Sequence, residues 1–409
     1  MANSLRVCIF TETYFPVVGG GETQARLLAE GLVRKGNYVI ILTRRTDSSH
    51  AKVERYGGIT VYRLPPTGRQ HLKKWGLLLS SFPALFRLRS QYDFLLVSGF
   101  RVVGVSAVLM SKILHKCCLL KADNNGEMSG AFFKGGLEKV GWKLNSAFFN
   151  SCLGLRNLIL RNADGFIAIS AQIAEELATH GIQVDDKIHC IPNSVNTEIF
   201  HPVSCSERRR LRGLLGLPDK EILVIYTGRL VSYKGLPHLL KVWKDLSRKY
   251  RNAGLVLVGG GSLDIYNCEN ELKAYVFENE LQESVFFSGE VRNVHEYLQA
   301  ANLFVFPTEK EAFGISVIEA MACGLPVVAT AVGGLKNILQ DGQNGLVVEP
   351  ADKNGLFQAL EMLITDQERA RELAQAAIQT ARADYDAEIV TEKYMKLFNR
   401  VRLEKSQQQ

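Results

Sequence analysis

Short runs of consecutive apolar residues alternate along the chain with segments in which apolar residues recur three and four positions apart. The short runs predict buried strands, and the second pattern predicts the helices that cover them. Residues 22–35 show the helical spacing, and Gly36 is a typical helix stop. The predicted strands are residues 7–10, 38–43, 58–64, 93–98, 117–122, 164–170 and 188–191, then 221–226, 254–258, 285–289, 303–307, 326–329 and 345–348. Strands that alternate with helices indicate parallel sheets joined by right-handed crossovers.

The alternation starts over near residue 195, after the turn-forming residues Pro192, Asn193 and Ser194. A chain of 409 residues is also too long for one ordinary hydrophobic core. Both observations predict two α/β domains, each with a doubly wound sheet. The C-terminal segment keeps a helical pattern, with an apolar stripe that runs from Tyr385 to Val401.

Two carboxylates follow the predicted strand 303–307, which ends at a proline. Glu311 lies on the loop after this strand, and Glu319 is expected about two turns into a helix that ends at Gly324. Ligands of open α/β sheets bind at the carboxyl ends of the strands, and a helix N-terminus there favours an anion. We therefore predict a bound phosphate, with carboxylates beside it that bind hydroxyls. The alternative is one surface glutamate and one glutamate on a helix face.

Three consecutive glycines, Gly19 to Gly21, precede the predicted helix 22–35. Glycines let a backbone approach a ligand closely, and the helix start again favours an anion. The spacing matches neither the dinucleotide fingerprint GxGxxG nor the P-loop GxxxxGK[ST], so neither site is predicted. The alternative is a flexible loop without a ligand.

Composition places the protein among globular proteins, with 46% hydrophobic and 22% charged residues. The N-terminus leads directly into a predicted strand, so we expect no signal peptide and a cytoplasmic location. The apolar segment that comes nearest to transmembrane length, residues 94–110, contains Arg101. The eight cysteines lack CxxC or metal-like spacings, and we expect them to be reduced thiols.

The charge is uneven along the chain. Residues 1–200 carry a net charge of +9, and residues 201–409 carry −2. A basic first half suggests an anionic membrane surface or a phosphorylated acceptor as its partner. Nucleic acid is not predicted, because no nucleic-acid-binding motif is present. Residues 69–86 and 132–149 combine basic and aromatic residues in helical segments, which either lie on a membrane interface or pack into the core.

The motifs of this chain resemble those of the retaining glycosyltransferases of family 4, which have the two-domain architecture called GT-B. The resemblance covers most of the chain in order and is most specific in the second half. The matching segments are YFPVVGGGE at 14–22, IPNSV at 191–195, GRLVSYKG at 228–235, GGGS at 259–262, EAFGISVIE at 311–319, AMACGLPVVAT at 320–330, GG at 333–334 and NGL at 344–346.

The resemblance implies a nucleotide-sugar donor that is bound mainly by the second domain. Arg229 and Lys234 would neutralise the diphosphate, where negative charge builds up as it leaves. Together with Glu311, which would contact hydroxyls of the donor sugar, they form the implied catalytic set. Glu319 would bind the ribose. The other implied donor contacts are Gly19, Gly20, Gly260, Val291 beside the base, Phe313, Gly314, Ile315 and Ser316.

The acceptor-side histidine of the family is not evident in this chain. Asp123 and Glu127 lie in the corresponding segment and are candidates for contacts with acceptor hydroxyls. The alternative is that both are turn residues with local hydrogen bonds. Asp384 and Asp386 match the metal-binding DxD motif of the other major glycosyltransferase fold, but acids are expected there because a helix begins. No metal site is predicted.

The implied architecture is an acceptor domain over residues 1–195 and a donor domain over 196–384, which face each other across a deep cleft, with a final helix over 385–409 that crosses back. The implied reaction is retaining, metal-independent and cofactor-free hexosyl transfer from a UDP- or GDP-sugar. The acceptor would be a lipid-linked, polysaccharide or glycolipid precursor, with peripheral contact to the cytoplasmic face of a membrane. Two alternatives stay open: a pyridoxal-phosphate-dependent phosphorylase and a non-catalytic nucleotide-sugar-binding protein.

Overall fold

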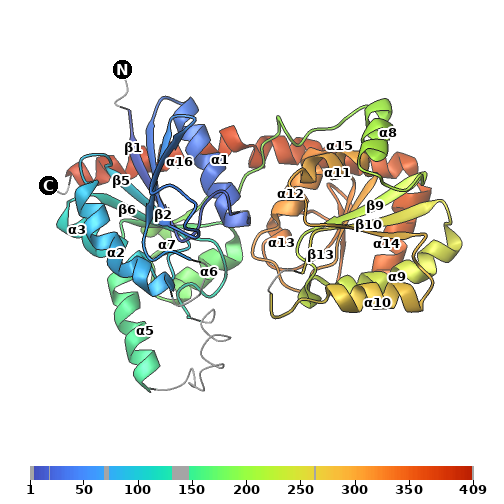
Figure 1. Cartoon of the computed structure of the whole chain (residues 1–409), viewed down its shortest axis with the longest axis horizontal. Helices are drawn as coiled ribbons and strands as arrows, with labels where there is room; N and C mark the ends of the chain where they lie inside the picture. The colour runs from blue at the N-terminus through green and yellow to red at the C-terminus, as the bar shows by residue number, and fades with distance from the viewer. Residues whose placement is uncertain (1–3, 18, 69–72, 131–146, 262–263, 408–409) are drawn as a thin grey trace. The chain divides into compact units, whose positions relative to one another are not determined.

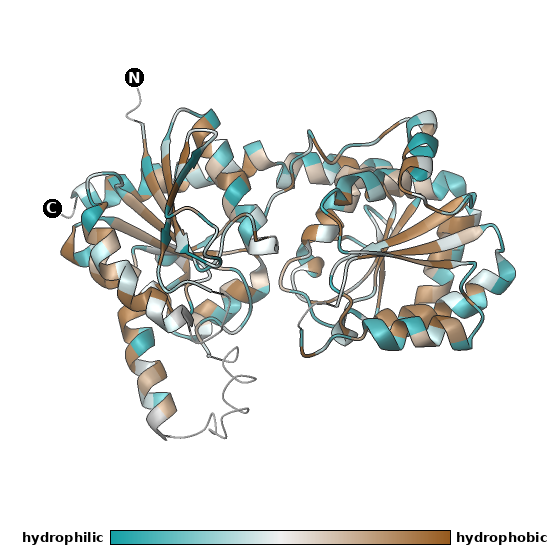
Figure 2. Cartoon of the chain, viewed as in Figure 1, coloured by the Kyte–Doolittle hydropathy of each residue, from teal (hydrophilic) through white to brown (hydrophobic). Residues whose placement is uncertain are grey.

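The computed structural model describes residues 4–17, 19–68, 73–130, 147–261 and 264–407. The chain forms two compact units, one of residues 1–193 with 387–409 and the other of residues 194–386. The C-terminal segment therefore belongs to the first unit. In each unit, helices cover both faces of a sheet whose strands are mostly hydrophobic (Figures 1 and 2).

The first unit contains an eight-stranded sheet in the order β3-β4-β2-β1-β5-β6-β7-β8. Its strands are β1 (Arg6–Thr11), β2 (Tyr38–Arg44), β3 (Val53–Tyr56), β4 (Ile59–Leu64), β5 (Phe94–Ser98), β6 (Cys117–Ala122), β7 (Gly165–Ala168) and β8 (Ile188–Cys190). All neighbours pair in parallel except β3, which is antiparallel to β4. The pattern of apolar runs did not predict β3, because three of its four residues are exposed and it buries none.

Among the described residues, the helices of the first unit are α1 (Gly20–Arg34), α2 (Lys73–Arg87), α3 (Gly104–Ile113), α5 (Ala147–Leu160), α6 (Ala171–Thr179), α7 (Val184–Lys187) and α16 (Ala387–Gln407). Helix α1 begins at Gly20, two residues earlier than predicted, so Gly20 and Gly21 belong to its first turn. Helix α16 packs into the core of this unit, where the rings of Phe398 and Phe94 lie 5.0 Å apart.

The second unit contains a fully parallel sheet of six strands in the order β11-β10-β9-β12-β13-β14. The strands are β9 (Ile222–Thr227), β10 (Ala253–Val258), β11 (Val285–Gly289), β12 (Leu303–Phe306), β13 (Val327–Thr330) and β14 (Leu346–Val348). The helices are α8 (Cys205–Leu214), α9 (Leu236–Lys249), α10 (Glu269–Glu278), α11 (Val294–Ala300), α12 (Ile315–Ala322), α13 (Leu335–Ile338), α14 (Lys353–Thr365) and α15 (Gln367–Thr380). A short 3-10 helix occupies Ser232–Lys234, and a turn of π-helix occupies Ala381–Tyr385.

In both sheets the order in which successive strands are added reverses once. In the first unit β1 lies between β2 and β5, and in the second unit β9 lies between β10 and β12. The loops that leave the two strands at such a switch point run to opposite faces of the sheet, and this leaves a crevice for ligands at the carboxyl ends. The predicted residues Arg229 and Lys234 follow β9, and Glu311 follows β12, at the switch point of the second sheet.

Two further sequence predictions concern the cysteines and membrane spans. All eight cysteines are free, and five of them are buried, as predicted for reduced thiols of the core. Among the described helices, none combines the length and the apolar character that a membrane crossing requires.

Candidate active site

An ion pair between Lys234 and Glu311 lies at the switch point of the second sheet. Lys234 ends the loop after β9, and Glu311 lies on the loop after β12. The Lys234 Nζ donates a hydrogen bond of 2.6 Å to Glu311 Oε2, and the two side chains are 11% and 17% exposed. The structure therefore brings together two predicted catalytic residues that are 77 positions apart in the sequence.

Close backbone packing holds Lys234 against the end of β12. Gly235 has φ = +71°, and a Cβ atom at this position would lie 1.8 Å from the carbonyl oxygen of Pro307. Only glycine combines this conformation with so close a contact. The Lys234 ammonium also lies 4.9 Å from the ring centroid of Phe306, which adds a cation–π interaction.

Backbone N–H groups of its own loop hold the Glu311 carboxylate in place. Glu311 Oε1 accepts hydrogen bonds from the backbone N–H groups of Ala312, at 3.0 Å, and Phe313, at 3.4 Å. A Cβ atom at Gly334 would lie 2.5 Å from the carbonyl oxygen of Ala312, so the next loop packs directly on this one. The Phe313 side chain is buried against Tyr385, which leaves the backbone of Phe313 as its only candidate ligand contact.

Helix α12 begins beside this ion pair. Gly314 precedes the helix with φ = +110°, and no side chain caps the first turn. Backbone N–H groups in the first turn of a helix have no acceptor within the helix, so those of Ile315 and Ser316 are suited to an anion. The helix begins at Ile315, so Glu319 lies just over one turn into it and not about two turns as predicted.

The Glu319 carboxyl is only partly exposed, and dense protein surrounds it. This burial raises the pKa of Glu319 to about 8. Glu319 is therefore largely neutral at pH 7. A carboxyl whose pKa is strongly raised is typical of a functional site.

Arg229 also follows β9 but is 57% exposed. Its guanidinium donates to Asp264 Oδ2 at 2.5 Å and to the Tyr233 hydroxyl at 2.7 Å. The Tyr233 ring lies 6.0 Å from the Arg229 guanidinium and 5.8 Å from the Lys234 ammonium. Both predicted cations thus lie near one aromatic ring. Neither Asp264 nor Tyr233 was among the predicted site residues: Asp264 belongs to no motif, and Tyr233 lies within the GRLVSYKG segment, which pointed only to Arg229 and Lys234.

The other predicted donor contacts lie at the ends of β10 and β11. A Cβ atom at Gly259 would lie 2.0 Å from the carbonyl oxygen of Gly228, and Leu230 donates to the Gly260 carbonyl at 3.0 Å. These contacts fasten the loop after β10 to the loop that carries Arg229. Val291 lies on the loop between β11 and α11. All predicted residues of the second unit therefore lie at the carboxyl edge of its sheet.

In the first unit, Asp123 follows β6 at the corresponding edge. Its Oδ2 accepts a hydrogen bond of 2.6 Å from the Ser98 hydroxyl, and its Oδ1 pairs with the buried Lys121 ammonium. Lys121 also donates to Asn193 Oδ1 at 3.0 Å. The Asp123 carboxylate borders Gly21 and Gly99, and it is 15% exposed. Gly19 and Gly20 precede Gly21 at the start of α1.

The structure gives Glu127 an internal role. Its side chain is 1% exposed and accepts a hydrogen bond of 3.3 Å from the Asp123 N–H, and the nearest guanidinium contact is 3.5 Å from Arg101. Burial raises the pKa of Glu127 to about 7, although Arg101 opposes this shift. A carboxyl buried in this way holds the loop after β6 and does not face an acceptor, contrary to the expectation for Glu127.

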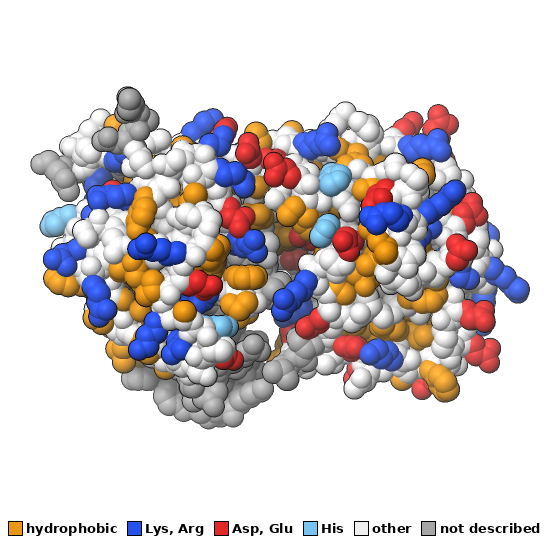
Figure 3. All heavy atoms as spheres, turned by 45° about the horizontal axis from the view of Figure 1, so that its top comes forward, with side chains coloured by type: hydrophobic (Ala, Val, Ile, Leu, Met, Phe, Trp, Pro, Cys, Tyr) orange, Lys and Arg blue, Asp and Glu red, His pale blue; other side chains and the backbone are white. Residues whose placement is uncertain are grey.

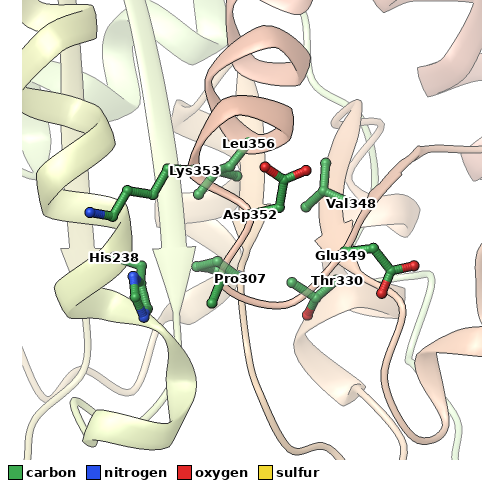
Figure 4. A pocket seen from close by; sticks show the side chains of 9 residues that line it. His238, Pro307, Thr330, Val348, Glu349, Asp352, Lys353 and Leu356 are labelled. Atoms are coloured by element: carbon green, nitrogen blue, oxygen red, sulfur yellow. The ribbon is translucent and has the colours of Figure 1, made fainter.

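A small hollow near the site does not involve the predicted residues. It is lined by His238, by residues at the ends of β12, β13 and β14, and by the start of α14 (Figure 4). Its free space accommodates about one water molecule. The His238 Nε2 lies 3.9 Å from Glu309 Oε1. We attribute no ligand to this hollow.

The aspartates of the DxD sequence lie where α15 gives way to α16. Asp386 accepts a hydrogen bond of 2.5 Å from the Thr197 hydroxyl. Within the described parts of the chain, no group of three or more His, Cys, Asp or Glu side chains is arranged to hold a metal ion.

Two protein-family models match this chain. The model of "Glycosyltransferase Family 4" matches residues 18–199, and that of "Glycosyl transferases group 1" matches residues 207–380. An uncharacterized glycosyltransferase from Methanocaldococcus jannaschii is 25% identical over 374 residues, which cover 88% of this chain and 90% of the relative.

Two solved structures show the same architecture over nearly the whole chain. Sucrose-phosphate synthase from Thermosynechococcus elongatus superposes with a TM-score of 0.79 and 25% identity, covering 97% of this chain and 99% of the other. HepE from Anabaena, solved in complex with UDP and glucose, has a TM-score of 0.76 at 18% identity, with 97% and 99% covered, which shows the fold alone. The chain has the GT-B fold and belongs to glycosyltransferase family 4, among the glycosyl transferases of group 1.

Proposed function

We propose that this protein transfers a sugar from a nucleoside-diphosphate sugar to an acceptor with retention of configuration. The observation that supports this most directly is the Lys234–Glu311 pair at the switch point, beside the uncapped start of α12. A cation and free N–H groups suit a diphosphate, and a carboxylate next to them suits sugar hydroxyls. The membership in a glycosyltransferase family fits this arrangement.

The leaving group in this reaction is a nucleoside diphosphate, which gains negative charge as the glycosidic bond breaks. Lys234, Arg229 and the N–H groups of Gly314, Ile315 and Ser316 are the donors that would stabilise this charge. Because these donors are fixed by the loops after β9 and β12, little reorganisation is needed during the reaction. We propose that Glu311 binds hydroxyls of the donor sugar and fixes its orientation.

The nucleoside would lie along the same edge. We propose that Glu319 binds the ribose and that the backbone around Gly260 and Val291 contacts the base. UDP is the first candidate nucleotide, because HepE, which shares the fold, was solved with UDP. GDP is the second candidate.

We propose a same-face mechanism for retention. The acceptor hydroxyl would attack from the side on which the diphosphate leaves, and a phosphate oxygen would take its proton. This mechanism needs no side-chain nucleophile at the anomeric carbon. It also needs no metal, because Lys234 and Arg229 neutralise the diphosphate.

The proposed acceptor is a lipid-linked, polysaccharide or glycolipid precursor, which would place the protein at the cytoplasmic face of a membrane. A phosphorylated sugar is the second candidate, because the product named for the Thermosynechococcus relative, sucrose phosphate, carries a phosphate. We propose Asp123 as the contact with an acceptor hydroxyl. Its two hydrogen-bond donors, Ser98 and Lys121, hold the carboxylate in one orientation.

Two other activities predict different measurements. A pyridoxal-phosphate-dependent phosphorylase would show the absorbance band of a lysine Schiff base, which we expect to be absent from the purified protein. A non-catalytic nucleotide-sugar-binding protein would bind the donor without turnover. It would not need Arg229, Lys234, Glu311 and Glu319 together.

The first experiment is a thermal-shift screen against UDP, GDP, ADP and their common sugar conjugates in the presence of EDTA. A ligand that binds the folded state raises the melting temperature by mass action. We expect a rise with one nucleotide in the wild-type protein and a much smaller rise in Lys234→Met. Equal shifts in both proteins, or no shift with any nucleotide, would contradict the proposed donor site.

A further inference from the structure

Helix α2 exposes large apolar side chains to solvent. Trp75, Leu79 and Phe86 are 48%, 71% and 51% exposed, and their spacing of four and seven residues places them on one side of the helix. The opposite side faces the core, where Leu77 and Leu85 are fully buried. Helix α2 is therefore apolar on both sides, which a helix of a soluble domain rarely is unless a partner covers it.

The two neighbouring helices continue this surface. Helix α2 packs on α3, and α3 packs on α5 (Figure 1). Each contributes exposed apolar side chains one helical turn apart, and much of α5 is strongly hydrophobic (Figure 2). The apolar face, as we call it, consists of Trp75, Leu79, Phe86, Leu109, Ile113, Leu155 and Leu158, which are 37% to 71% exposed. Single exposed apolar residues are ordinary, but a set on three packed helices marks an interaction surface.

The charge of this surface is of one sign. Helices α2, α3 and α5 contain no aspartate or glutamate. Arg87 and Lys112 are exposed, and the Arg89 guanidinium lies 4.4 Å from the ring centroid of Phe86. Asp164, beyond the end of α5, pairs with Lys112 at 3.4 Å and also with Lys405. On the visible surface of the first unit, Figure 3 shows basic and hydrophobic side chains with some acidic ones among them.

These observations favour an anionic membrane over a second copy of this chain as the partner that covers the apolar face. A second copy of the chain, related by a two-fold axis, would bring two identical basic surfaces together, and like charges repel. An anionic bilayer accepts both components, because apolar side chains enter the interface while arginine and lysine meet the head groups. Since no described helix can span a membrane, the contact would be peripheral.

We propose that the apolar face of α2, α3 and α5 docks the protein onto an anionic lipid bilayer. This surface lies on the first unit, and none of its residues belongs to the donor site of the second unit. The proposal therefore does not depend on the donor chemistry. It would bring the unit that carries Asp123 to the surface where a lipid-linked acceptor is found.

The test is flotation of the full-length protein with vesicles of phosphatidylcholine alone or with phosphatidylglycerol added. We expect binding to the anionic vesicles only, at least tenfold weaker in 0.5 M salt, where the screening length falls to about 4 Å. In a Trp142→Phe background, which removes the tryptophan outside the described residues, Trp75 is an internal reporter: its fluorescence should shift to the blue on binding, while the fully buried Trp243 does not respond. The variant Trp75→Phe should lose most of this shift.

The decisive variant is Leu79→Glu combined with Phe86→Glu, which should reduce anionic-vesicle binding at least tenfold. Both positions are exposed, so the fold should tolerate the changes, and an unchanged melting temperature and thermal response to UDP would verify this. The matched control is Phe277→Glu on α10 of the second unit, which is 73% exposed and should leave vesicle binding unchanged.

Three outcomes would overturn the proposal. The first is a wild-type protein that does not float with anionic vesicles, and the second is a double variant that floats as the wild type does. Sedimentation could also show a dimer that the double variant abolishes while no vesicle binding occurs. That result would identify the apolar face as an interface between copies of this chain.

Discussion

Replacing Lys234 by methionine tests whether the ion pair at the switch point is the donor site. Methionine keeps most of the volume and the apolar stem of lysine but removes the ammonium group. The change leaves the Glu311 carboxylate, 17% exposed, without its hydrogen bond of 2.6 Å. Two consequences, one for stability and one for activity, can be measured separately.

The stability loss follows from the burial of the pair. Removing one partner of a fully buried pair costs about 3–5 kcal/mol, and partial exposure lowers this to about 2 kcal/mol here. For a domain the size of the second unit, that loss corresponds to a melting temperature lower by about 4–8 °C. Adding Glu311→Gln removes the lone carboxylate, so the double variant should regain most of the stability.

The functional loss should not be restored in the double variant. A hydrogen bond to a charged group contributes about 1.5–3 kcal/mol, so UDP should bind Lys234→Met about 10- to 150-fold more weakly. Loss of one fixed donor to a developing negative charge typically lowers turnover by about 10²–10³-fold. The assays are calorimetric titration with UDP and sugar transfer or donor hydrolysis under saturating donor.

The control is Lys241→Met on α9, which removes the same charge from an exposed position of the same unit. It should change neither UDP affinity nor turnover by more than about twofold. The reasoning is refuted if Lys234→Met binds UDP as the wild type does, or if the double variant regains turnover together with stability.

Three further predictions concern single positions. Gly235→Ala should lower stability by at least about 2 kcal/mol in urea unfolding and weaken UDP binding, because its Cβ would meet the Pro307 carbonyl; a stable variant would contradict this packing. The folded pKa of Glu127, about 7, lies above the ordinary 4.5, so stability should fall as pH rises from 4.5 to 7, by about 3 kcal/mol in all. Glu127→Gln should abolish this fall in urea titrations at pH 5 and 8, and an unchanged pH dependence would count against the burial argument. Because the pKa of Glu319 is about 8, and an ionised carboxylate accepts hydrogen bonds more strongly, UDP affinity should rise between pH 7 and 9 in the wild type but not in Glu319→Gln.

The sequence predicted the strands of both sheets well because buried parallel strands are continuous apolar runs. The segment 303–307 is such a run, and β12 occupies residues 303–306. The loop position of Glu311 follows from that strand. Glu319 was expected about two turns into its helix and lies just over one turn into α12, because the left-handed Gly314, which the apolar pattern does not reveal, sets the helix start.

The contacts made by the side chains were not predictable in the same way. Ser98, Lys121 and Asn193 converge on one edge because β5 and β6 are neighbours in a parallel sheet, yet they share no sequence motif. The pattern also left open whether residues 69–86 pack into the core or face outward. In the described part of that segment, α2 does both, because Leu77 and Leu85 are buried while Leu79 and Phe86 are exposed. Residues 131–146, which include most of the second basic and aromatic segment, lie outside the described residues.

The ion pair between Lys234 and Glu311 also bears on how the proposed donor would enter the site. A diphosphate competes with Glu311 for the Lys234 ammonium, and its larger negative charge should win that competition. Glu311 would keep its hydrogen bonds from the N–H groups of Ala312 and Phe313, which fix the carboxylate from the backbone side. Its Oε2, released from Lys234, would then be available to sugar hydroxyls. Before the donor binds, the Lys234 ammonium and the Glu311 carboxylate neutralise each other and hold each other in place. On binding, the diphosphate would take over the ammonium and the sugar hydroxyls the carboxylate, so the loops would need little rearrangement.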